Sequence, residues 1–229
     1  MIAHGFHEWN SNPVVQQLNS DHDLQVLLRH IAVEPFTTVT AKYLACGFSR
    51  RRGNMLRQKL ETLGLIMSVK IKTTRGITTL LELTHIARDW LKKNRAKITP
   101  LNGGIRHAYW QHDCKRLLES HGWNVKLEWI PDNSNHAFDI AAWKDNRRLL
   151  LEIESGKSNW QLNAQMLLKH ASHHPLILWI GDLYPPRNHQ LHKLPVQIIR
   201  PAELNRWVLG NQLDKTSESN MIHQEVTED

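Results

Sequence analysis

The sequence predicts a mixed α/β protein of two domains, and three observations support this. Residues 21–95 read as short amphipathic helices followed by two extended runs. Residues 96–104 contain Pro and Gly and are typical of a linker. Residues 105–209 alternate helical and strand-like segments, which predicts a mixed sheet flanked by helices. We expect residues 1–20 to be a flexible arm, because they are polar and lack periodicity, and residues 210–229 to be a disordered tail.

The first domain is predicted to contain three helices, a β-hairpin and a closing helix. A helical pattern begins at Asp21 and ends at Pro35. The remaining expected elements are helices at Val39–Ala45 and Arg50–Leu63, strands at Leu65–Lys72 and Ile77–Leu83, and a helix at His85–Lys93. A short helix, a tight turn and a longer helix in this order predict a winged helix-turn-helix domain.

Positive charge is concentrated in this first domain, which favours a nucleic-acid partner. Residues 21–97 contain 15 Lys and Arg against 6 Asp and Glu, within a chain whose net charge is +7. Recognition helices use Arg, Asn and Gln to contact base edges. We expect the DNA-binding residues to be Arg50, Arg51, Arg52, Asn54, Arg57 and Gln58 of the long helix, with Arg75 at the hairpin tip. A solvated basic surface, or a surface for protein contacts, is the alternative interpretation.

The second domain is predicted to have a helix, three strands, a helix and a further strand, an αβββαβ order with one more strand and a closing helix. The expected elements are a helix at 105–121, a strand at 125–130, two strands within 138–157 joined by the tight turn Lys144-Asp145-Asn146, a helix from Ser158 to about Ser172, strands at 176–180 and 196–199, and a helix at 202–209. Trp129, Trp143 and Trp179 fall in these strands, and we expect them in the core.

Three acids on one predicted hairpin are the most informative feature of the chain. Asp139 lies on the first strand, and Glu152 and Glu154 lie on the second, where alternation places both on one face. An unpaired buried carboxylate costs several kcal/mol, so we expect a divalent cation, Mg²⁺ or Mn²⁺, to be bound there. The main-chain carbonyl of Ile153 is a further candidate ligand, and Lys157 is placed to act on a bound phosphate.

These residues resemble the bipartite motif of the PD-(D/E)XK nuclease superfamily, whose core is the restriction-endonuclease-like αβββαβ fold. The resemblance covers residues 103–181. Asp139 matches its first acid and Glu152 its second, whereas Glu154 stands where the motif has Lys. Lys157 is the candidate replacement, in a string that resembles the E-x-E-[ST]-G-K-S variant.

The resemblance also implies supporting residues and partners. His107, in a segment similar to the opening helix of that subgroup, is expected near the site. Gln161 and Gln165 are the candidates for the supporting glutamine of the following helix. The subgroup implies a role beside mobile elements or DNA-translocating ATPases, so a partner ATPase or recombination subunit is possible. Because one active site cuts one strand, double-strand cleavage would need a homodimer or such a partner.

The leading hypothesis is therefore a metal-dependent DNA endonuclease targeted by its winged-helix domain. The alternatives are a catalytically inactive DNA-binding or assembly factor, which Glu154 favours, and a transcription regulator. Two cysteines without CxxC spacing argue against a disulfide framework or structural zinc. The absence of long apolar runs and of a signal-peptide pattern predicts a soluble, cytoplasmic protein that does not contact membranes.

Overall fold

The computed structural model describes residues 11–73, 76–132, 134–157, 159–170, 174–181 and 196–210. The chain divides into two compact units, Met1–Ala108 and Tyr109–Asp229. The boundary falls inside helix α7 (Gly104–Ser120). Together the units form a mixed α/β protein with two open sheets, as the sequence predicts.

The first unit contains the helices and the hairpin that the sequence predicts, within two residues of the expected bounds. They are α3 (His22–Val33), α4 (Val39–Ala45), α5 (Arg50–Thr62), β1 (Ile66–Thr73), β2 (Gly76–Leu83) and α6 (His85–Lys93). The side chains of Asp21, Thr38, Ser49 and Thr84 each accept a main-chain N–H at the start of a helix. These local caps explain why the boundaries could be predicted.

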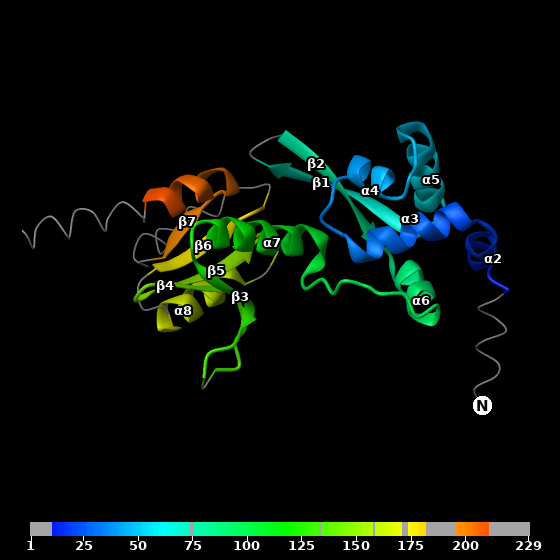
Figure 1. The fold of residues 1–229 in the computed structure, drawn as a ribbon. Helices are drawn as coiled ribbons and strands as arrows, with labels where there is room; N and C mark the ends of the chain where they lie inside the picture. The colour runs from blue at the N-terminus through cyan, green and yellow to red at the C-terminus, as the bar shows by residue number, and fades with distance from the viewer. Residues whose placement is uncertain are drawn as a thin grey trace, which may run out of the picture. The chain divides into compact units, whose positions relative to one another are not determined.

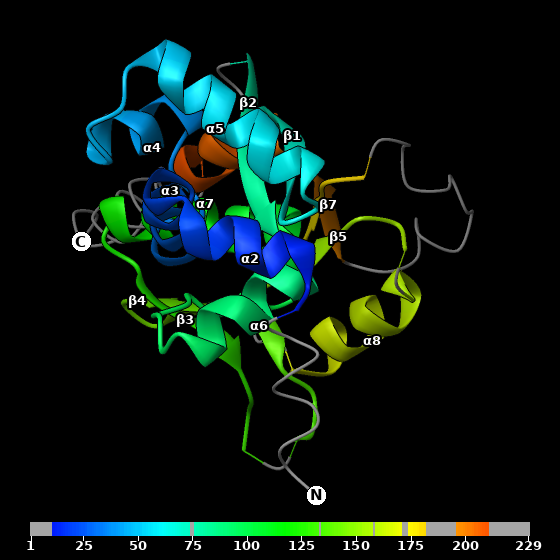
Figure 2. The same ribbon diagram turned by 90° about the vertical axis from the view of Figure 1, so that its right-hand side faces the viewer.

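An additional helix, α2 (Pro13–Ser20), corrects the expectation that residues 1–20 form a flexible arm. Val15 and Leu18 are 2% and 0% exposed and belong to the core of this unit. The side chain of Asn19 accepts a hydrogen bond of 2.9 Å from Trp90 Nε1, which ties α2 to α6 (Figure 2). Two buried apolar positions in one short helix are too few to register as a periodic pattern, and residues 1–10 lie outside the described part of the chain.

The segment expected to be a linker is bound to the first unit along part of its length. Thr99 donates from its main-chain nitrogen to the carbonyl of Ala32 and from its hydroxyl to the carbonyl of Val33. Ala96 and Ile98 pack against the core of the same unit. These contacts satisfy carbonyls at the end of α3, which a helix leaves without intrahelical partners.

The second unit contains a five-stranded sheet in the order β3-β4-β5-β6-β7. Its strands and remaining helix are β3 (Asn124–Trp129), β4 (Phe138–Lys144), β5 (Arg147–Glu154), α8 (Trp160–His170), β6 (His174–Trp179) and β7 (Gln197–Ile199). The first three strands are antiparallel, whereas β6 and β7 run parallel to β5. The parallel pairing requires a crossover connection, which α8 provides. The expected helix–strand order is thus present.

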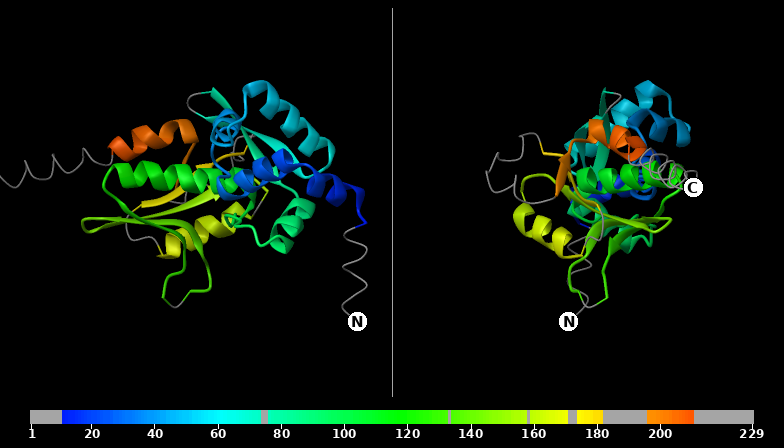
Figure 3. Two further views of the ribbon diagram at one scale, coloured as in Figure 1. Left: turned by 45° about the vertical axis from the view of Figure 1, so that its right-hand side comes forward. Right: turned by 90° about the vertical axis from the view of Figure 1, so that its left-hand side faces the viewer.

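Helices cover both faces of this sheet. Figure 3 shows α8 on one face, and α7 together with the helical residues 201–210 on the other. Trp160, Ala164 and Leu167 of α8 pack on Ile177 and Trp179 of the sheet. The helix predicted from Ser158 begins slightly later; Ser158 lies outside the described residues, and the side chain of Asn159 accepts from the Leu162 N–H instead.

A backbone irregularity in β3 changes which side chains share a face. Glu128 has φ +49°, the left-handed region that side chains other than Gly rarely adopt. Strict alternation predicts Val125, Leu127 and Trp129 on the core face, but only Val125 is buried, whereas Leu127 is 36% exposed and Trp129 is half-buried. Trp129 and Trp143 are half-buried and pack against the buried core, so they lie at its margin. The core assignment is confirmed for Trp179, which is 3% exposed.

Within the described part of the chain, no helix has the length and apolar character needed to cross a bilayer.

Because α2 contributes to the core, shortening one of its buried side chains should destabilise the first unit. Leu18→Ala is expected to lower the free energy of unfolding by about 2–5 kcal/mol, through lost burial and an uncollapsed cavity. Gln16→Ala, on the exposed side of the same helix, should change it by less than about 0.5 kcal/mol. Urea unfolding followed by circular dichroism measures both, and equal midpoints for the two variants would contradict the position of α2.

Candidate active site

The three predicted acids lie together in the β4–β5 hairpin and are all buried. Asp139, Glu152 and Glu154 are 9%, 4% and 1% exposed. The regular antiparallel register ends at the pair Ile140–Leu151, and its continuation would set Asp139 opposite Glu152. Beyond this pair, a side chain takes the place of a main-chain hydrogen bond between the strands, since Asp139 Oδ2 accepts the Ile153 N–H at 2.7 Å. The hairpin therefore delivers two carboxyl groups to one place.

The Asp139 and Glu152 carboxyl groups lie close enough for the charge of Asp139 to oppose the ionisation of Glu152. Burial is the largest cause that raises the pKa of Glu152, and the charge of Asp139 and a hydrogen bond between the two side chains add to it, so that the pKa reaches about 10. Two carboxylates side by side in a buried site disfavour double ionisation. A site of this kind retains a proton or binds a cation in its place.

His136, in the loop before β4, holds the other side of Glu152. Its Nε2 lies 2.8 Å from Glu152 Oε1. Burial is the main cause that lowers the pKa of His136, and the nearby Asp139 charge opposes it. Since the two shifts favour a neutral imidazole and a neutral carboxyl, this contact is a hydrogen bond and not an ion pair near neutral pH. His136 is not among the residues predicted from the sequence, although a histidine two residues before the motif strand is a usable signal.

Gln111 of α7 holds Asp139 from the other direction and was also missed. Its Nε2 donates to Asp139 Oδ1 at 3.2 Å and to the carboxylate of Glu128. The side chain is 4% exposed, and it lies one turn after His107 on the helix that the sequence predicts. The left-handed backbone at Glu128 thus places a further carboxylate beside this amide.

Glu154 and Lys157 differ in their placement from the first two acids. Alternation along the strand places Glu154 on the same face as Glu152, and the charge of Glu154 contributes to the raised pKa of Glu152. Its Oε1 accepts from Asn163 Nδ2 of α8 at 2.6 Å, a partner that the sequence analysis did not identify. Lys157 follows β5 with an exposed side chain. Its action on a phosphate stays a prediction.

The two glutamines expected to support the site are exposed on α8. Gln161 and Gln165 flank Asn163 at a spacing of two, which in an α-helix places them on the opposite side from it. The helix itself is present as predicted, and its Asn163 donates to Glu154. His107 belongs to the first unit, where its Nδ1 lies 3.3 Å from the carbonyl of Asn102. Its approach to the acids stays a prediction.

The donor atoms fit a hard divalent cation with an incomplete protein shell. Two carboxylates are the usual protein contribution to Mg²⁺, which keeps water and substrate phosphate in its other positions. The Glu154 carbonyl accepts from the Ile180 N–H, on the side of β6. Because main-chain groups of successive strand residues point to opposite sides, the N–H and C=O of Ile153 point toward β4 and Asp139. The Ile153 carbonyl is therefore a third available oxygen. The described ranges contain no group of three His, Cys, Asp or Glu side chains arranged around an ion, so the fit rests on two carboxylates and one carbonyl.

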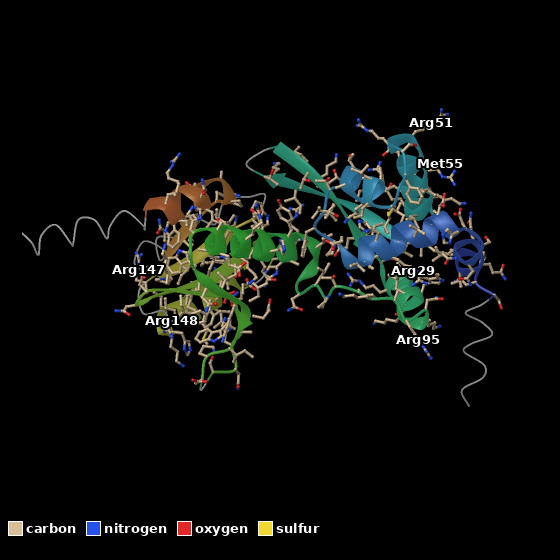
Figure 4. All side chains as sticks on the ribbon, in the orientation of Figure 1. Arg29, Arg51, Met55, Arg95, Arg147 and Arg148 are labelled. Carbon is tan, nitrogen blue, oxygen red and sulfur yellow. The ribbon has the colours of Figure 1, made fainter. Side chains whose placement is uncertain are left out.

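Several basic residues of α5 are ion-paired, including Arg52, which is also exposed. Arg52 pairs with Asp23, and Lys59 pairs with Asp21 at 2.8 Å. Arg57 lies 3.9 Å from Glu61, and Asn54 accepts from the Tyr43 hydroxyl at 3.3 Å. The exposed side chains of the helix include Arg50, Arg51, Met55 and Gln58, of which Arg51 and Met55 are marked in Figure 4. Arg75 lies outside the described residues.

Comparisons with known proteins find only distant structural matches. No family model and no curated protein matches the chain. The solved structures include the protein of unknown function AF1548 (19% identity, TM-score 0.33, 47% of this chain) and VC1899 from Vibrio cholerae (13%, 0.37, 87%). They also include Can2 from Sulfobacillus thermosulfidooxidans in complex with cyclic tetra-adenylate (12%, 0.41, 90%). The chain spans 65% of AF1548, 56% of VC1899 and 55% of Can2. At these identities the function has to be inferred from the chain's own residues.

The carboxyl pair predicts a pH-dependent stability in metal-free buffer. Because the pKa of Glu152 is raised to about 10 in the folded chain, the protein holds a proton there that the unfolded chain releases near its ordinary value of 4.5. This contribution is full below the unfolded pKa and is lost as pH rises through the folded one. With EDTA present, the thermal midpoint of the wild type should fall between about pH 5 and about pH 9. Glu152→Gln, which keeps a neutral group, should show a shallower decline, and parallel curves would contradict the shared proton.

Proposed function

We propose that the chain is a metal-dependent nuclease that hydrolyses phosphodiester bonds of DNA. The observation that carries this proposal is the buried contact between the Asp139 and Glu152 carboxyl groups in the β4–β5 hairpin. A purely structural hairpin gains nothing from two buried acids facing each other, because burial and mutual repulsion both oppose their ionisation. A divalent cation removes both costs.

The residues of the site then take separate roles. Asp139, Glu152 and the Ile153 carbonyl hold Mg²⁺ or Mn²⁺, which supplies charge stabilisation at a phosphoryl oxygen and a more acidic bound water. Gln111 fixes Asp139, and His136 fixes Glu152, so that the two carboxylates keep their orientation. Lys157 contacts the scissile phosphate and stabilises the charge that develops on it.

The first unit targets this activity to DNA as a winged helix-turn-helix. Its element order is α3-α4-α5-β1-β2-α6. Helix α5 exposes Arg50, Arg51 and Gln58, whose side chains suit phosphates and base edges. Arg52 and Lys59 are engaged by Asp23 and Asp21, and their contribution to binding is smaller.

A second candidate function is a DNA-binding or assembly factor that no longer cuts. Glu154 favours it, because this residue replaces the lysine of the resembling motif and is hydrogen-bonded to Asn163. The two candidates differ in one measurable property, which is cleavage in the presence of a divalent cation.

Removal of either central carboxylate should abolish cleavage. Asp139→Asn and Glu152→Gln are each expected to lower the rate on single-stranded and plasmid DNA by at least about 100-fold in Mg²⁺ or Mn²⁺, because each removes a metal ligand. Asp113→Asn, the same change at an acid that pairs with Arg116 on α7, is the matched control and should cut normally. Cleavage by both site variants at the wild-type rate would contradict the proposed centre. DNA binding without cleavage by the wild type would select the assembly factor.

Loss of the exposed arginines of α5 should weaken DNA binding and its salt dependence. Arg50→Ala with Arg51→Ala removes two phosphate contacts, so the slope of log K against log salt should become shallower by about 2 for duplex DNA. Lys92→Ala with Lys97→Ala removes the same charge from exposed positions outside α5 and should leave the slope nearly unchanged. Fluorescence anisotropy at several salt concentrations measures both slopes. Identical slopes for the wild type and the α5 variant would show that Arg50 and Arg51 do not contact DNA.

A further inference from the structure

An aromatic and basic surface lies on one face of the second unit's sheet, across β3, β4 and β5. We call it the tryptophan platform and define it as Lys126, Trp129, Trp143 and Arg148. The two indole rings meet edge to face with centroids 5.5 Å apart. Lys126 Nζ lies 5.8 Å from the centre of the Trp143 ring, and the Arg148 guanidinium lies 5.7 Å from that of Trp129.

Residues from three strands form the platform on one face of the sheet. Trp143 of β4 pairs directly with Arg148 of β5, so their side chains share a face. Trp129 of β3 joins them because the left-handed backbone at Glu128 interrupts the alternation of the strand. β3 is the edge strand of the sheet, so no described strand lies beside it on its outer side.

The platform is partly open to solvent. Lys126 is exposed, whereas Trp129 and Trp143 are half-buried and also pack against the core. Arg148 is half-buried as well, and a terminal nitrogen of its guanidinium donates to the His170 carbonyl. A ring whose face is covered by an exposed lysine presents that face to water once the flexible lysine moves aside. Partly exposed indoles are costly to leave on a surface, and this cost is the reason to look for an occupant.

A continuous series of side-chain contacts joins the platform to the carboxyl pair. Trp129 stacks on Phe138 with a centroid distance of 6.3 Å, and Phe138 meets the His136 ring at 4.7 Å. His136 in turn contacts Glu152 at 2.8 Å. The platform and the candidate metal ligands are therefore ends of one cluster in one unit.

We propose that the tryptophan platform binds an unpaired nucleic-acid strand that leads to the Asp139–Glu152 pair. Indole faces accept stacked bases of any sequence, and flanking cations pair with the phosphates between them. A duplex cannot use such a surface in this way, because its bases already stack on each other. The inference that the bound strand runs toward the Asp139–Glu152 pair rests on the proposed nuclease function, whereas the inference that the platform binds the strand does not.

The test measures affinity of the full chain in EDTA, where no cutting occurs. The probes are fluorescein-labelled oligo(dT) and oligo(U) of about 15 nucleotides and a duplex of the same length. Trp143→Leu is expected to weaken binding of an unpaired probe about tenfold by removing a stacking face, and to leave duplex affinity unchanged. The ratio of oligo(dT) to oligo(U) affinity distinguishes a deoxyribose strand from a ribose strand, which offer the platform the same chemistry.

Charge variants keep the test decisive if Trp143→Leu disturbs the fold. Lys126→Gln alters an exposed side chain and should make the salt slope for the unpaired probe shallower by about 0.7. Arg147→Gln is the matched control, because this residue neighbours Arg148 but lies over Trp123, on the opposite face of the strand. It should leave binding of the unpaired probe unchanged.

The outcomes separate this inference from the nuclease function. Equal unpaired-strand affinity and slope in wild type, Lys126→Gln and Arg147→Gln would overturn the platform and leave only a surface stabilised by cation–π contacts. That result is compatible with full cleavage by the wild type. Weakened binding in Lys126→Gln and Trp143→Leu, with wild type that never cuts, would retain the platform and reject the nuclease. Photocrosslinking of 5-iododeoxyuridine oligonucleotides to Trp129 or Trp143 would locate the strand directly.

Discussion

The contact between two buried carboxyl groups, Asp139 and Glu152, is the constraint on which the second unit depends. Each acid costs free energy to bury, and burial together with the nearby Asp139 charge raises the pKa of Glu152 to about 10. Hydrophobic residues at these positions would stabilise the sheet better than the acids do. The acids are therefore best understood through what they bind.

The surrounding fold is arranged to hold these carboxyl groups from several directions. Gln111 reaches Asp139 from α7, His136 reaches Glu152 from the loop before β4, and Asn163 reaches Glu154 from α8. The irregular backbone at Glu128 serves two regions, because it sets a carboxylate beside Gln111 and turns Trp129 toward Trp143. A single local distortion thus links the acidic site with the aromatic surface.

The parts of this structure that depend on neighbouring residues in the chain could be predicted, and those that depend on distant ones could not. The caps Thr38 and Ser49 mark helix starts locally, and the hairpin carries its own alternation and turn. The docking of α2, the left-handed Glu128 and the contacts of Gln111 and His136 arise from tertiary packing, which leaves no periodic signal. The apolar pattern of α5 likewise predicts Met55 in the core together with Leu56 and Leu60, whereas Met55 is 53% exposed.

The most direct measurement of the central claim is a crystal structure of the full chain soaked in Mn²⁺, with anomalous diffraction collected to locate the ion. We expect a peak bound by Asp139, Glu152 and the Ile153 carbonyl, at metal–oxygen distances of about 2.0–2.2 Å. We also expect the direct contact between the two carboxyl groups to be lost on binding. A saturating soak that leaves this contact intact and the position empty would contradict the proposed site.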